Sequence, residues 1–198
     1  MANVDRPFGL RPVAHLKGGS WNGKTQLCYI PSTASIPAFI GDAVVRAGTA
    51  NATGVYPTMV IATAGATNPI YGVITSFELD ASYLGYVHQA DDTSRFCHVC
   101  CDPDVIFEIQ DDGAAVLGIA SVGLNANLIY THAGNAITGY SGTELDTAGT
   151  TADATAQLLI LGAAPYPDND ATLAHTVWRV LISQHQLRNL GGGGMLGS

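Results

Sequence analysis

Residues 95–110 read RFCHVCCDPDVIFEIQ, and this stretch decides the fold class. Residues 95–101 and 105–110 are rich in β-branched and aromatic side chains, which favour strands. The segment Asp102-Pro103-Asp104 between them has the composition of a turn. The stretch therefore predicts two short strands joined by a tight connection.

Runs of the same kind recur along the chain every ten to twenty residues, separated by Gly, Pro, Asn and Asp. The other predicted strands are residues 25–30, 43–47, 58–63, 70–79, 157–161 and 176–186. The last run is apolar on much of both faces, which indicates a central or covered strand. The spacing predicts an all-β fold, a single β-barrel or a jelly-roll-like β-sandwich.

The structure expected for three segments between the runs differs from one segment to the next. Residues 114–121 fit either a short helix or a buried strand, because eight residues are too few for periodicity to decide. Residues 141–156 are small, polar and rich in Thr, as is typical of an exposed loop. Residues 165–170 (PYPDND) predict a turn.

The positions of Pro and Gly indicate how the chain is divided into an arm, a domain and a tail. Pro7 and Pro12 oppose a helix in residues 1–24, and the glycines at 18, 19 and 23 are expected to break any strand there, so this segment is predicted to be an extended arm. Residues 25–190 form one β-rich domain. Residues 191–198, which begin with four glycines, are predicted to be a flexible tail.

The composition points to a protein whose surface is covered by other protein. Apolar residues make up 47% of the 198 residues, enough for a packed core, but charged residues make up only 12%. This is about half the usual share for a soluble domain. The net charge of −8 argues against a nucleic-acid partner, since phosphate binding needs a dense basic face.

Charge is also distributed unevenly along the chain. Residues 1–25 contain four basic residues and one acid, a net +3, whereas the remainder contains four arginines and fifteen acids, a net −11. A basic arm on an acidic body is typical of a segment that docks on an acidic surface, such as another copy of the protein or an assembly partner.

The sequence predicts neither a membrane segment nor secretion. No stretch approaches 18 uninterrupted apolar residues, and the N-terminus lacks the pattern of a signal peptide. We therefore expect synthesis in the cytoplasm, with the four cysteines reduced and buried.

The metal candidates are weak. Residues 97–102 (CHVCCD) contain a C-x-x-C without a second ligand pair at a suitable distance, and strand alternation would place its ligands on two faces. Buried structural thiols are favoured over a metal or redox role. The acids Asp102, Asp104, Glu108, Asp111 and Asp112 do not follow the calcium-loop pattern and are interpreted as solvated turn residues, with an interfacial ion left open.

No catalytic pattern is present either. The chain contains no G-x-S-x-G. Residues 18–25 (GGSWNGKT) match the spacing of a phosphate-binding loop, but no strand is predicted before them, so the match is interpreted as chance. The sequence predicts no catalytic residue, no cofactor and no metal, so a non-enzymatic protein is expected.

Two stretches carry a resemblance to a known class of protein. The segments Phe8-Gly9-Leu10-Arg11-Pro12-Val13 and 18–23 (GGSWNG) resemble the N-termini of small structural proteins from tailed-bacteriophage head-gene clusters. The segment 39–45 (FIGDAVV), followed by 70–74 (IYGVI), resembles the hairpin pattern of capsid decoration proteins.

The resemblance implies a cement protein. Such a protein binds the outer surface of a mature phage head in the virion and ties neighbouring major capsid proteins together, commonly as a trimer or a dimer. An arm that crosses subunit boundaries is usual for the class, and residues 1–24 would fill this role.

The apolar and basic side chains of the arm are the expected partner-binding residues, with Arg11 paired to a carboxylate. They are Phe8, Leu10, Arg11, Val13 and Trp21. Two alternatives stay open. One is another virion structural role, as a head–tail connector or a tail-associated β-domain. The other is a carbohydrate-binding or hydrolytic β-sandwich that uses Trp21, Trp178 or tyrosines.

Overall fold

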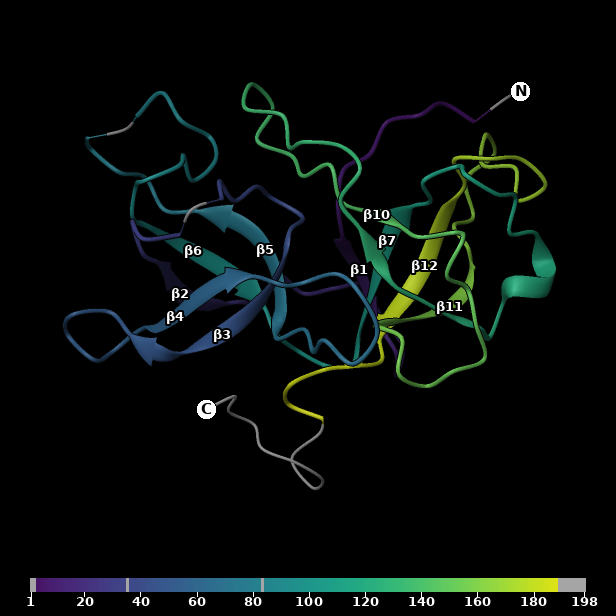
Figure 1. Ribbon diagram of the computed structural model, residues 1–198, viewed down its shortest axis with the longest axis horizontal. Coiled ribbons are helices and arrows are strands. Elements are labelled where there is room, and N and C mark those ends of the chain that lie inside the picture. The colour runs from purple at the N-terminus through teal and green to yellow at the C-terminus, as the bar shows by residue number, and fades with distance from the viewer. Residues whose placement is uncertain (1–2, 35, 83, 189–198) are drawn as a thin grey trace.

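The regular secondary structure consists almost entirely of short strands (Figure 1). The computed structural model describes residues 3–34, 36–82 and 84–188. The strands are β1 (Arg11–His15), β2 (Gln26–Ile30), β3 (Ala43–Ala50), β4 (Pro57–Ile61), β5 (Gly72–Phe77), β6 (Arg95–Cys100), β7 (Val105–Gln110), β8 (Asn125–Ala126), β9 (Leu128–Ile129), β10 (Glu144–Leu145), β11 (Leu158–Ala163) and β12 (Val177–Ile182). A single 3-10 turn covers Ile119–Ser121. The predicted all-β class is confirmed, and each predicted strand is present with its ends shifted by a few residues.

The first half of the chain closes into a five-stranded barrel with the order β2-β4-β3-β5-β6. Its strands pair antiparallel, except for a short parallel contact between β2 and β4 at Tyr29 and Thr58. Alternate residues of these strands point inward, as the pleat requires. Together with Ala38 and Tyr71, which lie outside the strands, they form an apolar cluster of Cys28, Ile30, Val44, Met59, Ile74, Cys97 and Val99.

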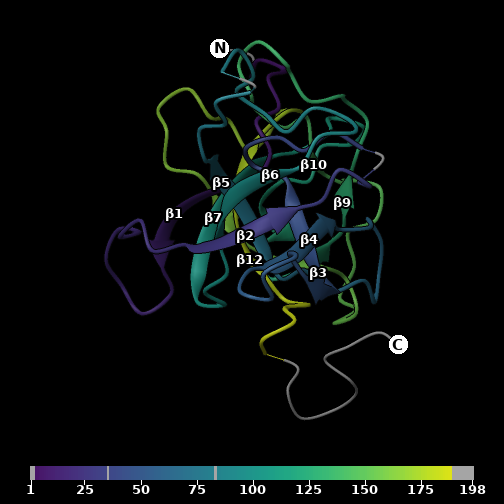
Figure 2. The same ribbon diagram turned by 90° about the vertical axis from the view of Figure 1, so that its left-hand side faces the viewer.

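The second half of the chain, joined by β1 from the N-terminal segment, builds a five-stranded antiparallel sheet with the order β1-β7-β12-β11-β8. β12 lies at its centre, with Trp178 opposite Ile109 and Val180 opposite Phe107, in accordance with the prediction of a covered closing strand. The barrel and the sheet lie side by side in Figure 1, with an apolar core shared between them. Figure 2, from the barrel side, shows β1 and β7 behind β2. The shared cluster contains Ala43 and Val73 from the barrel together with Phe107, Leu158 and Trp178 from the sheet.

The expectation that glycines break any strand in residues 1–24 is wrong for residues 11–15. β1 pairs antiparallel with β7, with Arg11 opposite Glu108. Gly18 and Gly19 have positive φ values of 101° and 90°, so they make a turn that brings Trp21 N–H back to the carbonyl oxygen of Val13 at 3.0 Å. Pro12 is tolerated because β1 is an edge strand and shifts register beside it. The segment is therefore part of the chain's own sheet.

Two further expectations need correction. Residues 114–121 are neither a regular helix nor a buried strand, since they are mostly exposed and end in the 3-10 turn. Residues 141–145 are buried although residues 141–156 were expected to be an exposed loop. The reason is that Glu144 and Leu145 pair with β9 and that the hydroxyls of Ser141 and Thr143 bind the buried carboxylate of Asp42.

One predicted segment cannot be compared with the structure. The tail predicted at residues 191–198, together with 189 and 190 of the predicted domain, lies outside the described residues. Among the residues that are described, no helix is long and apolar enough to span a bilayer.

Candidate functional site

The two stretches that carry the family resemblance meet in space. Leu10 N–H donates to the carbonyl oxygen of Gly41 at 2.8 Å, and Gly41 N–H donates to the carbonyl oxygen of Ile74 at 2.8 Å. A Cβ on Gly41 would lie 2.5 Å from the carbonyl oxygen of Phe8, and Gly9 and Gly41 both have positive φ values. Only glycine allows these backbones to approach so closely. The junction fixes the N-terminal segment against the barrel.

A groove of about 540 Å³ lies beside this junction. It collects four of the five predicted partner-binding residues, Phe8, Leu10, Arg11 and Trp21, and faces them with Ile40, Gly41, Ile74, Thr75 and Tyr140. Leu10 is only 1% exposed and belongs to the shared core, so its side chain is committed to this chain. Val13, the fifth residue, is half-buried in β1 and does not line the groove.

Arg11 has a carboxylate partner within its own chain. Its Nη2 lies 2.8 Å from Oε2 of the fully buried Glu108, and Arg179 Nε lies 3.3 Å from Oε1 of the same residue. Burial favours the neutral form of Glu108, but hydrogen bonds from Tyr166, Arg11 and Arg179 outweigh it and hold the pKa of the carboxyl below its usual value. The guanidinium also lies 4.9 Å from the centre of the Phe8 ring. Arg11 therefore anchors β1 and shapes one wall of the groove.

The interpretation of the acidic residues after β6 as solvated turn residues is wrong for Glu108 and Asp111. Both are fully buried. Asp111 accepts a hydrogen bond from Trp178 Nε1 at 2.8 Å, and burial raises the pKa of its carboxyl. Their partners Arg11 and Trp178 lie far away in the sequence, so local composition gave no signal of burial.

Three of the four cysteines are buried, as the sequence predicts, and the fourth is not. Cys28 and Cys97 face each other across β2 and β6 inside the barrel, whereas Cys100 points into the shared core, and these three are fully buried. Cys101 is half-buried, and all four thiols are free. Burial raises the pKa of Cys28 to about 12, so its thiol stays protonated at neutral pH.

Comparison of the chain with family models, with curated proteins and with solved structures finds no match. The functional argument therefore rests on the geometry of the described residues.

Exposed apolar side chains gather on three loops, residues 31–42, 78–94 and 130–143, which we call the loop end. Eight of the sixteen exposed large hydrophobic residues in the described chain lie there, although these loops are a small part of it. They are Ile36, Leu79, Leu84, Tyr86, Val87, Tyr130, Ile137 and Tyr140. Such a concentration is typical of a surface that binds another protein.

Hydrogen bonds hold the three loops together. Ala38 N–H donates to the carbonyl oxygen of Gln89 at 3.1 Å, and Ile40 N–H donates to that of Gly139 at 2.8 Å. The carboxylate of Asp42 accepts from Phe39 N–H at 2.7 Å and from the hydroxyls of Ser141 and Thr143. Loops 78–94 and 130–143 project from the same end of the molecule in Figure 1 and Figure 2.

The loop end adjoins the groove, because Ile40 and Tyr140 belong to both. Its three loops contain no Lys or Arg, and loop 78–94 carries Glu78, Asp80, Asp91 and Asp92. Sequence reasoning placed the candidate interface on the N-terminal segment and did not single out these loops. The available signal was the run 84–87 (LGYV), which is apolar in otherwise polar surroundings.

Proposed function

We propose that this protein is a structural, non-enzymatic decoration protein of a phage head, which binds the outer surface of the capsid and stabilises contacts between major capsid proteins. The observation that carries the proposal is the loop end. Eight exposed large apolar side chains on three loops that are hydrogen-bonded to one another are costly for a free monomer and suit a surface covered on assembly.

The loop end offers a place to seat an apolar anchor of the capsid protein. A cavity of about 690 Å³ opens between the loops and the barrel, lined largely by apolar groups that include Ile36, Phe39 and Tyr130. Pockets that bury one anchor side chain commonly supply a large share of the binding energy at an interface. The absence of basic residues from these loops fits a partner surface that is neutral or basic.

The N-terminal segment has a different part in this proposal from the one that its sequence suggested. Its strand β1 and the buried Leu10 belong to the fold, so the segment supports the groove, and Phe8, Arg11 and Trp21 form the groove wall that joins the loop end. A homo-oligomer, a trimer or a dimer, fits the low charge of the chain, which leaves much surface to be covered.

The experiment is binding of the purified protein to expanded empty phage heads that lack it, imaged by electron microscopy. Deletion of residues 2–24 is uninformative because it removes β1 and Leu10. We therefore use Ile137→Ser, at a residue 90% exposed on the loop end, and match it with Ile119→Ser, at a residue 82% exposed on the 3-10 turn outside the loop end.

Ile137→Ser combined with Leu79→Ser is expected to weaken head binding by at least tenfold, whereas Ile119→Ser leaves it unchanged. The fold is monitored by circular dichroism. Equal binding by all variants would refute the assignment of the loop end. Failure of the unmodified protein to bind heads would refute capsid decoration and direct the search to connectors and tails.

A further inference from the structure

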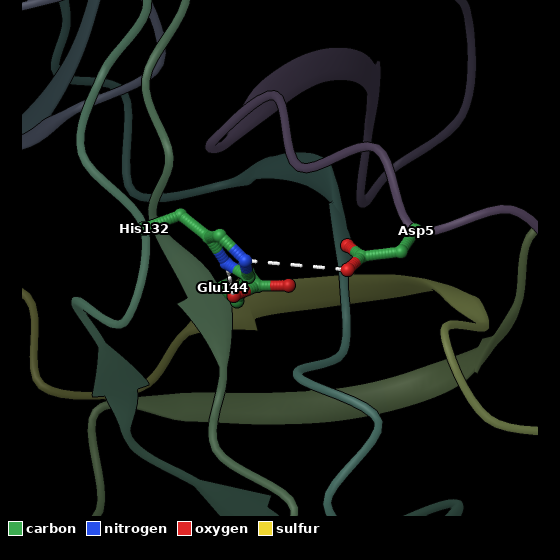
Figure 3. A group of neighbouring side chains, drawn as sticks. All are labelled: Asp5, His132 and Glu144. Carbon is green, nitrogen blue, oxygen red and sulfur yellow. Dashed lines mark hydrogen bonds and ion pairs between the residues drawn. The ribbon is translucent and has the colours of Figure 1, made fainter.

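A second group of side chains lies apart from the groove, between the N-terminal segment and the β9–β10 hairpin. Asp5, His132 and Glu144 each offer one ligand atom within 4.8 Å of the ligand atoms of the other two. Figure 3 shows the three side chains converging, with the second carboxylate oxygen of Glu144 on the side of Asp5. No local motif joins all three residues, since Asp5 lies in the N-terminal segment, far in sequence from His132 and Glu144.

The hairpin fixes two of the three residues. Glu144 lies in β10 opposite Ile129 of β9, and Thr131 and His132 follow β9 after one intervening residue. Thr131 Oγ1 donates to Glu144 Oε2 at 2.6 Å, and His132 Nδ1 lies 2.7 Å from the same oxygen. The imidazole and the carboxylate are thus held side by side before any ligand arrives.

The third residue, Asp5, is held from both sides by the sheet. Arg6 N–H donates to Gln110 Oε1 at 2.7 Å, and Gln110 Nε2 donates to the carbonyl oxygen of Val4 at 2.9 Å. Asp5 Oδ2 then lies 4.0 Å from His132 Nε2, and its side chain is 46% exposed, which leaves it free to adjust.

Glu144 supplies the observation that points to a ligand. Its side chain is fully buried, and its Oε1 has no hydrogen-bond partner. A buried carboxylate oxygen without a partner is costly and calls for an unseen water or ion. The buried Nδ1 of His175 nearby also makes no hydrogen bond, and it forms a long ion pair with Asp5 Oδ1 at 3.9 Å.

We propose that Asp5, His132 and Glu144 bind one divalent transition-metal ion of the zinc type. One imidazole and two carboxylates are ligands that Zn²⁺ accepts, with water in the remaining position. Ca²⁺ and Mg²⁺ fit poorly because they prefer an all-oxygen shell. Ligand atoms around a tetrahedral Zn²⁺ lie about 3.3 Å apart, so the half-exposed Asp5 side chain has to move by roughly 1 Å.

The ion would tie the N-terminal segment to the β9–β10 hairpin. It would neutralise two carboxylates, one of which is buried beside the core residue Leu145. The site is therefore a structural metal site, and its existence does not depend on whether the protein binds capsids.

The test is calorimetric titration of the chelator-treated full chain with Zn²⁺, and with Ca²⁺ and Mg²⁺ in parallel. The variants are Asp5→Asn, on the half-exposed segment, and Glu144→Gln. The matched control is Glu78→Gln, because Glu78 Oε1 and His98 Nε2 form a comparable pair at 2.6 Å that has no third ligand among the described residues.

One equivalent of Zn²⁺ is expected to bind, more tightly than Ca²⁺ or Mg²⁺, with affinity reduced at least tenfold in Asp5→Asn and Glu144→Gln and unchanged in Glu78→Gln. Thermal unfolding scans with and without Zn²⁺ give a second readout, since an ion bound to the native state raises the melting temperature. Absence of stoichiometric Zn²⁺ binding would overturn the proposal and leave water beside Glu144. Unchanged affinity in Asp5→Asn would also overturn it, and this variant decides the matter if Glu144→Gln does not fold.

Discussion

The barrel and the second sheet bury different kinds of side chain. The barrel interior is a cluster of apolar side chains and thiols such as Cys28, Met59 and Cys97, supplied by strands within residues 26–100. The second sheet draws strands from both ends of the chain and buries carboxylates, among them Glu108 and Asp111. Burial of a charge is tolerated only with partners, so the second sheet depends on specific long-range contacts to these carboxylates, whereas the apolar cluster inside the barrel needs none.

The largest expected effect comes from the centre of the second sheet. Trp178 is fully buried and donates to Asp111, so Trp178→Ala removes core packing and the hydrogen bond together. We expect the free energy of unfolding to fall by about 3–5 kcal/mol, measured by urea denaturation. Trp178→Phe keeps most of the packing and is expected to cost about 1–3 kcal/mol for the carboxylate left without its donor. An unchanged stability of Trp178→Phe would show that the buried acid does not depend on its partner.

The buried residue His185 is expected to make the stability of the protein depend on pH. Burial, together with the positive charge of Arg188, lowers the pKa of His185 from 6.5 to about 4. Its Nδ1 accepts from Leu187 N–H at 3.1 Å, which requires the neutral ring. Because the folded pKa lies below the unfolded one, the unfolded chain binds more protons between pH 6.5 and 4, and this contribution to stability is lost as the pH falls.

The expected loss at His185 is roughly 3 kcal/mol between pH 7 and pH 4. His185→Gln removes it, so the stability difference between variant and parent should shift in favour of the variant by this amount on acidification. Urea denaturation at both pH values measures the shift. A pH-independent difference between the two proteins would contradict the assignment.

A substitution at β1, the edge strand of the second sheet, is expected to lower the free energy of unfolding by a smaller amount. Arg11→Met removes the 2.8 Å contact to Glu108 and leaves the buried carboxylate with Tyr166 and Arg179. We expect a loss of about 1.5–3 kcal/mol, the usual value for a hydrogen bond to a charged group. Lys24→Met, at an exposed position in the same segment, is the control and should stay within about 0.5 kcal/mol of the parent.

The smallest effect is expected inside the barrel. Ile30 is 2% exposed and belongs to the apolar cluster of the barrel, so Ile30→Val should cost about 0.5–1.5 kcal/mol. The cost should be the same at pH 7 and pH 4, since the change removes a methylene group and no charge. A pH-dependent cost would indicate that the two regions are coupled more closely than their separate cores suggest.

Sequence reasoning succeeded best where structure is local. The strands at 26–30, 95–100 and 105–110 follow from β-branched and aromatic runs, and alternation correctly placed Cys97 and Cys100 on opposite faces. It failed for residues 11–15, where the glycines form a turn that allows β1 to pair with β7 instead of breaking the strand.

The candidate surface was predicted only in part. Phe8, Arg11 and Trp21 do line one groove, but Leu10 is buried in the core, and the exposed loops beside the groove were not predicted. Whether an apolar residue in a loop is exposed depends on what the fold brings beside it, and periodicity carries no information about that.

The sequence by itself determined the all-β class, the position of most strands and the burial of three thiols, because strand periodicity and turn composition act over a few residues. Only the tertiary structure decided that Glu108, Asp111 and Glu144 are buried and that Asp5 lies beside His132. The presence of an Asp or Glu in a sequence does not reveal whether its carboxylate is solvated or buried. Its environment is set by partners such as Arg11 and Trp178, which strand pairing brings from distant parts of the chain.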